Sequence, residues 1–301
     1  MKIIKYIVIL LSFLSQYAIA QQKNCLLTKT SVQQFGKIIW SEIITYDKFD
    51  NIIQKDNTFD NPLEGSYTKS IKNTYNKNNK LIVSQTLLNG KLINQLSQEF
   101  GEAGNLVKTI NNNQISEVAY AVGSEIKLIK NNQGEIISKE ETNKDNLGRT
   151  LKFSRYLSDT LEVSQILYNY SPQNKTLSIE NKDLSAKVFV KNEYTYDSNL
   201  NLEKDSEYLN GILNAQTNYI YEGEKLINKA RFNKVGKKEY EISYVYNPVG
   251  DVEKQIYTSS NGEKSEINIS YDIKRNKILE TESDYFGHIF KTTTYEYSCK
   301  Q

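Results

Sequence analysis

Histidine, cysteine, proline and tryptophan are scarce in this chain of 301 residues, which contains one, two, three and one of them respectively. Because His288 is the only histidine, a Ser-His-Asp triad or a multi-histidine metal site would have to use it or do without histidine. His288 follows Phe286-Gly287, which is typical of a hairpin turn, so we expect an exposed turn residue. No glycine-rich phosphate loop joins a strand to a helix. We therefore predict no enzymatic activity, no metal and no cofactor.

The chain also lacks a large net charge, since 38 basic and 36 acidic residues give +2. Two of the lysines, Lys2 and Lys5, lie at the extreme N-terminus, and without them each sign has 36 residues (38 less two, against 36). Nucleic-acid binding and adsorption to anionic membranes usually need a basic excess. We therefore expect no nucleic-acid partner.

Long hydrophobic runs are absent after the first twenty residues. Lys2 and Lys5 precede the apolar core Tyr6–Leu14, and Ala18-Ile19-Ala20 supplies the small residues of a cleavage site. A transmembrane anchor is the alternative, but the run is shorter than the roughly 20 residues that span a bilayer. We predict a signal peptide at 1–20 and an exported chain, which is secreted, periplasmic or at the cell surface.

Tyrosine, in contrast, is abundant, with 22 residues, and aromatic pairs return about every 25 residues. The second aromatic of each pair, which we call the repeat anchor, is spaced by 25 or 26 residues in the C-terminal half. These anchors are Tyr170, Tyr196, Tyr221, Tyr246, Tyr271 and Tyr297. Weaker copies are anchored on Tyr46, Tyr75 and Phe100. A fixed period of this size indicates an array of supersecondary units that pack on their neighbours.

The unit that begins at Thr217 illustrates the design. Thr217, Tyr219 and Tyr221 alternate with polar or aliphatic residues, which places them on one face of a strand. A turn at 222–224, a strand at 225–232 and a turn at 233–237 lead to the next aromatic strand. Asn-Gly pairs at 89–90, 210–211 and 261–262 predict type I′ hairpin turns. No segment keeps a helical apolar period.

The predicted fold is all-β: an elongated antiparallel β-meander repeat array, with about 25 residues and two strands per unit, in a curled or coiled sheet. We expect about ten units and about twenty strands in one domain, residues 21–301, with the clearest units at 168–297. The register between 100 and 168 stays open. Cys25 and Cys299 lie near the two ends of this domain. A disulfide between them would require a closed or strongly coiled sheet, whereas an open array would leave them unpaired.

Two segments resemble the YD repeat of Rhs-type proteins: Tyr46-Asp47 followed by Asn51-Ile52, and Tyr196-Asp197 followed by Asn201-Leu202. In that family a Tyr-Asp pair opens a turn, Gly or Asn follows, and an apolar residue starts the returning strand. The resemblance covers most of 46–297, although only three anchors are followed by Asp. It implies a β-meander and extracellular placement. Long members wrap their repeats into a hollow shell around a toxin, and this chain has far fewer units and no obvious toxin domain.

Several carboxylates are candidates for chemistry. Glu140-Glu141 and the pair Asp205 and Glu207 could serve glycoside hydrolysis, which needs two carboxyls at a set separation. On strands, however, such residues usually belong to a solvated face. Two further acidic pairs lie in turn-rich stretches but lack the spacing of a calcium loop; they are Asp47 with Asp50 and Asp56 with Asp60.

The function we predict is a non-enzymatic secreted or cell-surface repeat protein, which acts as a scaffold or an adhesive binding module for an unknown protein or glycan. The first alternative is an outer-membrane β-barrel, and the second is a secreted enzyme whose site the sequence does not reveal. Charged residues on the strands between the aromatic ones argue against a lipid-facing band, so we expect the chain not to span a membrane. The tyrosines either pack the buried face or contact a ligand.

Overall fold

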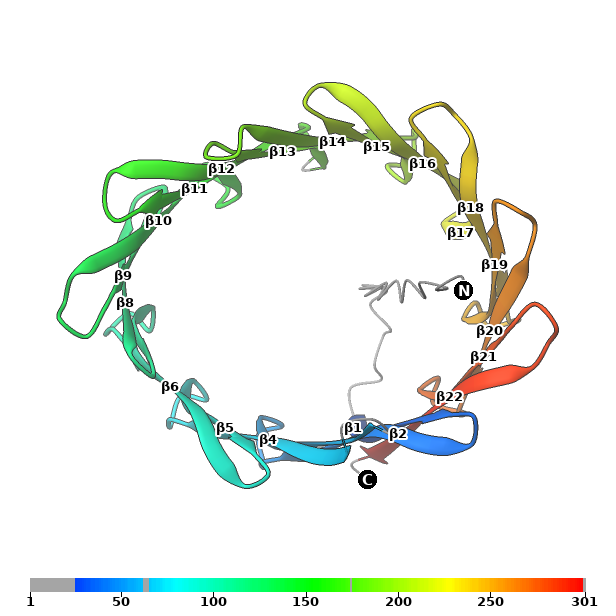
Figure 1. Ribbon diagram of the computed structural model, residues 1–301, viewed down its shortest axis with the longest axis horizontal. Coiled ribbons are helices and arrows are strands. Elements are labelled where there is room, and N and C mark those ends of the chain that lie inside the picture. The colour runs from blue at the N-terminus through cyan, green and yellow to red at the C-terminus, as the bar shows by residue number, and fades with distance from the viewer. Residues whose placement is uncertain (1–24, 62–64, 174, 300–301) are drawn as a thin grey trace, which may run out of the picture.

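The computed structural model describes residues 25–61, 65–173 and 175–299, so the predicted signal peptide lies outside the described residues. The described residues form 22 β-strands and no helix (Figure 1). The first eleven strands are β1 (Cys25–Gln34), β2 (Lys37–Tyr46), β3 (Ile52–Asn61), β4 (Gly65–Tyr75), β5 (Leu81–Leu88), β6 (Lys91–Phe100), β7 (Leu106–Asn111), β8 (Gln114–Ala121), β9 (Ser124–Lys130), β10 (Ile136–Lys144) and β11 (Thr150–Leu157). The others are β12 (Leu161–Tyr170), β13 (Thr176–Asp183), β14 (Val188–Tyr196), β15 (Leu202–Leu209), β16 (Ile212–Glu222), β17 (Lys225–Asn233), β18 (Lys238–Tyr246), β19 (Val252–Ser259), β20 (Lys264–Tyr271), β21 (Lys277–Ser283) and β22 (Ile289–Cys299).

The sheet closes on itself. Each strand pairs antiparallel with the next one in the chain, and β1 also pairs with β22 from Cys25–Cys299 to Gln34–Lys291. The 22 strands therefore form a closed barrel, seen end-on as a ring in Figure 1. The all-β meander was predicted correctly, but the elongated, curled or coiled open sheet is wrong. Closure satisfies the backbone groups that both terminal strands of an open sheet would leave unpaired.

A disulfide joins the first and last strands of the barrel. Cys25 and Cys299 stand directly opposite each other at the β1–β22 seam, with their Cα atoms 3.9 Å apart, and their sulfurs are bonded. The residues that lie 274 positions apart in sequence thus become neighbours only because the sheet closes.

The barrel is a single layer without a conventional core. Among the described hydrophobic side chains only five are buried: Cys25, Ile44, Ala215, Leu226 and Ile242. A ring of 22 strands spaced by about 4.8 Å and tilted by about 40° has a diameter of roughly 44 Å, too wide for side chains from opposite walls to meet. The strands are therefore held by their ladders and by contacts along each wall.

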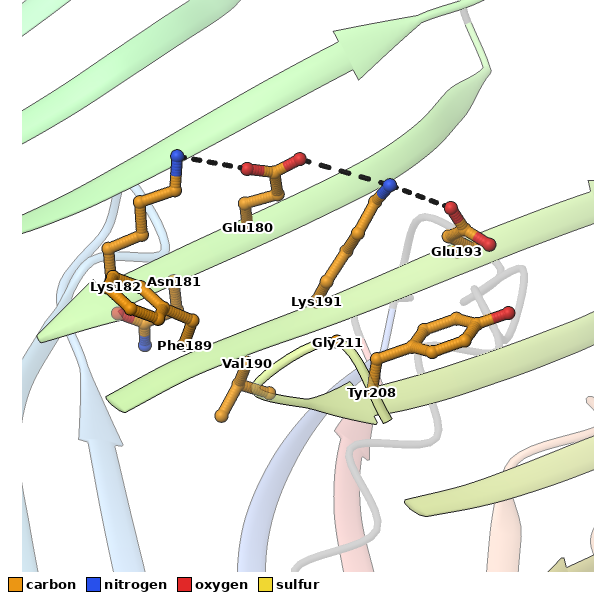
Figure 2. A pocket seen from close by; sticks show the side chains of 9 residues that line it. All are labelled: Glu180, Asn181, Lys182, Phe189, Val190, Lys191, Glu193, Tyr208 and Gly211. Carbon is orange, nitrogen blue, oxygen red and sulfur yellow. Dashed lines mark ion pairs between the residues drawn. The ribbon is translucent and has the colours of Figure 1, made fainter. Parts of the chain in front are cut away.

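The repeat anchors face the lumen. Following the pairing registers around the ring places all of them on one face, together with the five buried hydrophobic residues. This face is the more buried one, as expected for the concave side of a curved sheet. Figure 2 views β13–β15 from their opposite face, with the far wall of the ring behind them, which makes that opposite face the outer wall.

The two rims of the barrel differ. One, which we call the anchor rim, carries Cys25, Cys299 and the turns that follow the repeat anchors. The other, the hairpin rim, carries the remaining turns, which splay outward toward the viewer in Figure 1. At Asn89-Gly90 and Asn210-Gly211 of the hairpin rim both residues have positive φ, as a type I′ turn requires.

The Asn261-Gly262 turn does not have the predicted type I′ geometry. Only Gly262 has positive φ there, and the N–H of Ser259 bonds the carbonyl of Glu263 around a longer loop. This is the three-residue hairpin loop that ends in a left-handed residue. The same loop recurs at both rims, and its left-handed position holds Asp50, Asn79, Leu200 and Arg275 where glycine is absent.

The degenerate unit at 121–145 forms a regular hairpin, β9–β10, but lacks an aromatic anchor. Lys144 occupies the anchor position, and its ammonium pairs with Glu125 at 3.4 Å. Tyr120, near the end of β8, donates its hydroxyl to the carbonyl of Leu106 at the start of β7, as the anchors of the other units do. The β9–β10 unit is obscure in sequence because lysine stands where the other units have an aromatic residue.

Candidate functional site

The repeat anchors bind each unit to the one before it. The hydroxyl of Tyr246 donates to the carbonyl of Leu226 at 2.8 Å, and that of Tyr271 donates to Val252 at the same distance. Equivalent bonds run from Tyr46 to Leu27, Tyr75 to Ile52, Tyr170 to Thr150, Tyr196 to Thr176 and Tyr297 to Lys277. Each accepting carbonyl lies near the start of a returning strand. These seven tyrosines are therefore structural, and their hydroxyls are already occupied.

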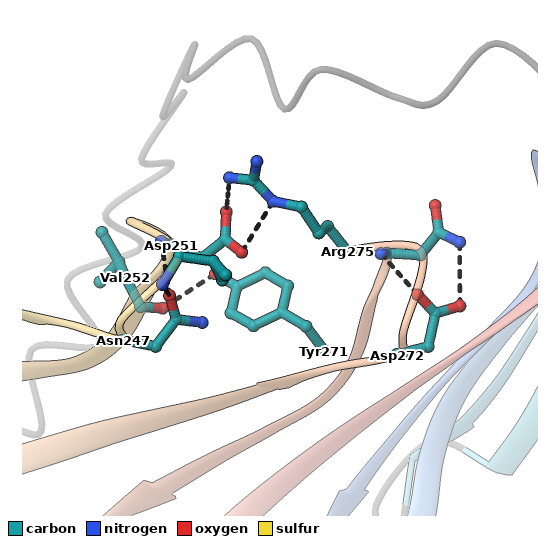
Figure 3. A network of polar contacts seen from close by, with 8 residues as sticks. Asn247, Asp251, Val252, Tyr271, Asp272 and Arg275 are labelled. Atoms are coloured by element: carbon teal, nitrogen blue, oxygen red, sulfur yellow. Dashed lines mark hydrogen bonds and ion pairs between the residues drawn. The ribbon is translucent and has the colours of Figure 1, made fainter.

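The residue after the anchor closes the turn. Asp272, labelled in Figure 3, accepts hydrogen bonds from the turn that follows it. Its donors are the backbone N–H groups of Lys274 and Asn276 and the side-chain amide of Asn276. These hydrogen bonds hold the pKa of its carboxyl below the usual range against the opposing effect of burial. Asn247 makes the same two backbone contacts in the preceding unit. An Asp, Asn or Ser at this position can do so, which explains why the Tyr-Asp pair is not strict.

An ion pair links neighbouring turns of the anchor rim. The Arg275 guanidinium holds both carboxylate oxygens of Asp251, at 3.1 and 2.5 Å, across the two units in Figure 3. Elsewhere on this rim a cation lies over an aromatic anchor, as with Lys175 over Tyr196 and Lys225 over Tyr246. These contacts of the rim thus hold neighbouring repeats together.

The first tyrosine of three of the pairs is placed differently. Tyr168, Tyr194 and Tyr219 point into the lumen two residues before their anchors and are only half-buried. None of these three hydroxyls makes a hydrogen bond to another described residue. Burial raises the pKa of Tyr194 and Tyr219, and the charge of Asp205 raises it further. We call these three residues the inner tyrosines.

Polar and charged side chains lie between the inner tyrosines. Asp205 stands opposite Tyr194 on β15, and Lys229 stands opposite Tyr219 on β17. Burial raises the pKa of Asp205 and lowers that of Lys229, since each is more than half enclosed on the concave wall. Arg231 lies beside Lys229 on the same face and pairs with Glu207 at 3.6 Å. The lumenal wall over β14–β18 therefore combines aromatic rings with charges of both signs.

The outer wall carries a shallow groove of about 360 Å³ over β13–β15 (Figure 2). A chain of ion pairs crosses it: Lys182 to Glu180 at 3.1 Å, Glu180 to Lys191 at 3.9 Å and Lys191 to Glu193 at 2.7 Å. Hydrogen bonding to Glu193 raises the pKa of Lys191, and the same bond lowers that of Glu193. Every charge here is matched, so the groove offers no unpaired acid or base for catalysis.

The structure separates most of the acidic candidates. Glu140 faces the lumen, where Lys127 and Arg155 pair with it at 3.0 and 3.3 Å, whereas Glu141 faces outward. Asp205 and Glu207 share the lumenal face, one residue apart on β15. The described residues contain no group of three or more metal-ligating side chains.

The remaining candidates take part in turns and surface contacts. Asp47 closes its turn by accepting the N–H of Phe49 and Asn51. Asp50 is the left-handed residue of that turn, and Asp56 and Asp60 accept hydrogen bonds from Gln54 and Ser66. The side chain of His288 is 78% exposed in the β21–β22 turn and lies 3.4 Å from Asp284. No helix in the described residues is suited to crossing a membrane.

Comparison with known proteins identifies no family: no family model and no curated protein matches the chain. Among solved structures, TcdB2-TccC3 without its hypervariable C-terminal region is similar with a TM-score of 0.34 and 9% identity, over 86% of this chain and 21% of that one. A porin-like protein from Bacteroides uniformis gives 0.33 and 8%, and one from Bacteroides vulgatus gives 0.22 and 11%, each over 90% of this chain and 98% of theirs. The chain thus spans about a fifth of the length of TcdB2-TccC3 without its hypervariable C-terminal region. Scores this low carry no argument about function.

The sequence singles out the second tyrosine of a pair only as the marker of the period, so the separate roles of the two tyrosines were missed. The signal lies in the residue that follows. The anchor is followed by a turn-closing residue such as Asp197 or Asn247, whereas the inner tyrosine is followed by another strand residue. The distinction between an occupied and an available hydroxyl depends on where the returning strand starts, which only the pairing register reveals.

Proposed function

We propose that this protein is an exported, non-enzymatic binding scaffold, a hollow barrel with water on both walls. The observation that carries the proposal is the charge on the outer wall. Ion pairs with both partners on that wall recur around the ring: Lys29–Glu296, Lys108–Glu99, Lys130–Glu117, Lys139–Glu141, Lys152–Glu162, Lys191–Glu193, Lys238–Glu241 and Lys254–Glu266.

A lipid-facing wall of this composition would be strongly unfavourable. Lys139 and Lys191 each lie fourth in a strand of nine residues, near the middle of the wall. A lysine that faces lipid at the bilayer midplane costs about 2–4 kcal/mol, so these two alone would cost about 4–8 kcal/mol. The total stability of a folded protein is about 5–15 kcal/mol. An aqueous outer wall avoids this cost.

An outer-membrane β-barrel is the second candidate. Its specific support is the closed meander with an even number of antiparallel strands, which is the architecture of outer-membrane barrels. The closed barrel fits this candidate at least as well as it fits a scaffold. The two candidates differ in what the outer wall contacts, and that contact can be measured.

Fractionation of the native host distinguishes them. Medium, periplasm, and salt-washed and detergent-extracted outer membrane are probed for the protein. Recovery in the medium or periplasm, or release by salt, is the expected result. Extraction by detergent alone, with heat-modifiable mobility on a gel, would establish the outer-membrane barrel instead.

A further inference from the structure

We propose that the lumenal wall over β12–β18 binds a neutral oligosaccharide or polysaccharide along the arc of the inner tyrosines, Tyr168, Tyr194 and Tyr219. This inference rests on the proposed function, because it needs a lumen that is open to water. It assigns a ligand class to this lumenal wall, because the barrel could form without the inner tyrosines at these positions.

The different hydrogen bonding of the two tyrosines in a Tyr-x-Tyr pair is the first support. The hydroxyls of the anchors Tyr170 and Tyr196 donate hydrogen bonds to the carbonyls of Thr150 and Thr176. The inner tyrosines make no such bond within the described residues, although they lie on the same concave wall. The anchor hydroxyls therefore hold neighbouring units together, whereas the inner hydroxyls take no part in this, and the ring of Tyr168 stacks on that of Tyr170 with the ring centroids 6.4 Å apart.

The spacing of the inner tyrosines is the second support. Each lies two residues before its anchor, so all three stand at the same height above the anchor rim. Consecutive members are two strands apart, which is about 10–13 Å along the wall at usual strand spacing and tilt. Contacts repeated at this interval suit a chain molecule with repeating units better than a compact ligand.

The chemistry between the rings is the third support. Asp205 and Glu207 are balanced by Lys229 and Arg231, so the wall carries both signs without a local excess. A strongly charged polymer would find like charges as often as opposite ones. A neutral sugar presents an apolar ring face to tyrosine and hydroxyls to the carboxylates, amines and amides beside it. Pockets that orient ligands commonly combine apolar faces with a few polar groups in this way.

Binding of neutral hexasaccharides tests the inference. The mature chain is titrated by calorimetry with cellohexaose, xylohexaose, mannohexaose and maltohexaose, and with a reduced, carboxymethylated polypeptide as the non-glycan probe. We expect saturable binding of at least one hexasaccharide. Tyr194→Ala and Tyr219→Ala should each weaken it at least tenfold, while Tyr219→Phe, which keeps the ring, should weaken it less than threefold.

A matched control and two opposing outcomes complete the test. Tyr208 lies on the outer wall of β15, so Tyr208→Ala should leave binding unchanged. Binding of the polypeptide alone, or hexasaccharide binding that Tyr208→Ala weakens as much as Tyr219→Ala does, would overturn the inference. A soluble, folded protein that binds no hexasaccharide would also overturn it and leave the proposed scaffold standing. If Tyr219→Ala does not fold, Tyr219→Phe against Tyr219→Leu replaces it, with only Leu expected to lose binding.

Discussion

Removing the anchor hydroxyls measures how far they hold the barrel together. Tyr246→Phe keeps the ring beneath Lys225, whose ammonium lies 5.2 Å from the ring centre, and deletes the bond to Leu226. A net hydrogen bond of this kind contributes about 0.5–1.5 kcal/mol. Tyr196 and Tyr271 make the equivalent bond at 2.9 and 2.8 Å in separate units. Because changes at distant sites add, we expect the triple Phe variant to lose about 1.5–4.5 kcal/mol of unfolding free energy.

Equilibrium urea unfolding, followed by far-ultraviolet circular dichroism, supplies the three single values and the triple value. Tyr194→Phe is the control, because the hydroxyl of this inner tyrosine donates no hydrogen bond to the described residues. The change should shift the unfolding free energy by less than about 0.3 kcal/mol, below the contribution of an ordinary hydrogen bond. Equal losses at Tyr194 and Tyr246 would refute the distinction between anchor and inner tyrosines. A triple variant no less stable than one single variant would refute the idea that every unit is tied separately to the one before.

Three further predictions concern the turns and the seam. The pKa of Asp197 lies below its usual range, chiefly because its carboxylate accepts the Asn201 N–H. The ionised carboxylate therefore stabilises the folded protein above the unfolded-state pKa, and this contribution is lost as pH falls through the lower folded-state pKa. Asp197→Asn, which keeps an accepting oxygen, should therefore lessen the loss of stability below about pH 4 in acid titrations. The disulfide closes 274 residues, so Cys25→Ser with Cys299→Ser should lower the unfolding free energy by up to about 5 kcal/mol in urea while circular dichroism of the folded state is unchanged; an unchanged midpoint would contradict this. Leu200 is 41% exposed at φ +64°, so Leu200→Gly should raise stability by about 0.5–1 kcal/mol, and a lower melting temperature would count against backbone strain there.

The repeat, its two strands per unit and most hairpins could be predicted from the sequence because they depend on local alternation and turn residues. Closure could not, since β1 and β22 lie at opposite ends of the chain and no short-range pattern pairs them. Which wall of the barrel some residues face could not be predicted from the sequence either. Val252 and Lys254 would share a face in an ideal strand, but a bulge after Val252 sends Val252 to the lumen and Lys254 outward. Such bulges follow most anchors and decide which charges line the lumen.

The inner tyrosines illustrate the same limit at the candidate site. The sequence marks Tyr194 and Tyr219 as members of aromatic pairs on one face, which the registers place on the lumenal wall. It does not reveal that Asp205 and Lys229 stand opposite them, because each pairing depends on the length of the intervening turn. The ligand surface thus arises from register and curvature rather than from any contiguous motif.

The central claim is that water, not lipid, covers the outer wall. The most direct measurement is the solution state of the mature chain, purified without detergent at any step, by sedimentation velocity and circular dichroism. The expected result is a folded, monodisperse β-sheet protein that does not change when mild detergent is added. A chain that aggregates in buffer and becomes folded and monodisperse only in detergent would contradict it and assign the barrel to the outer membrane.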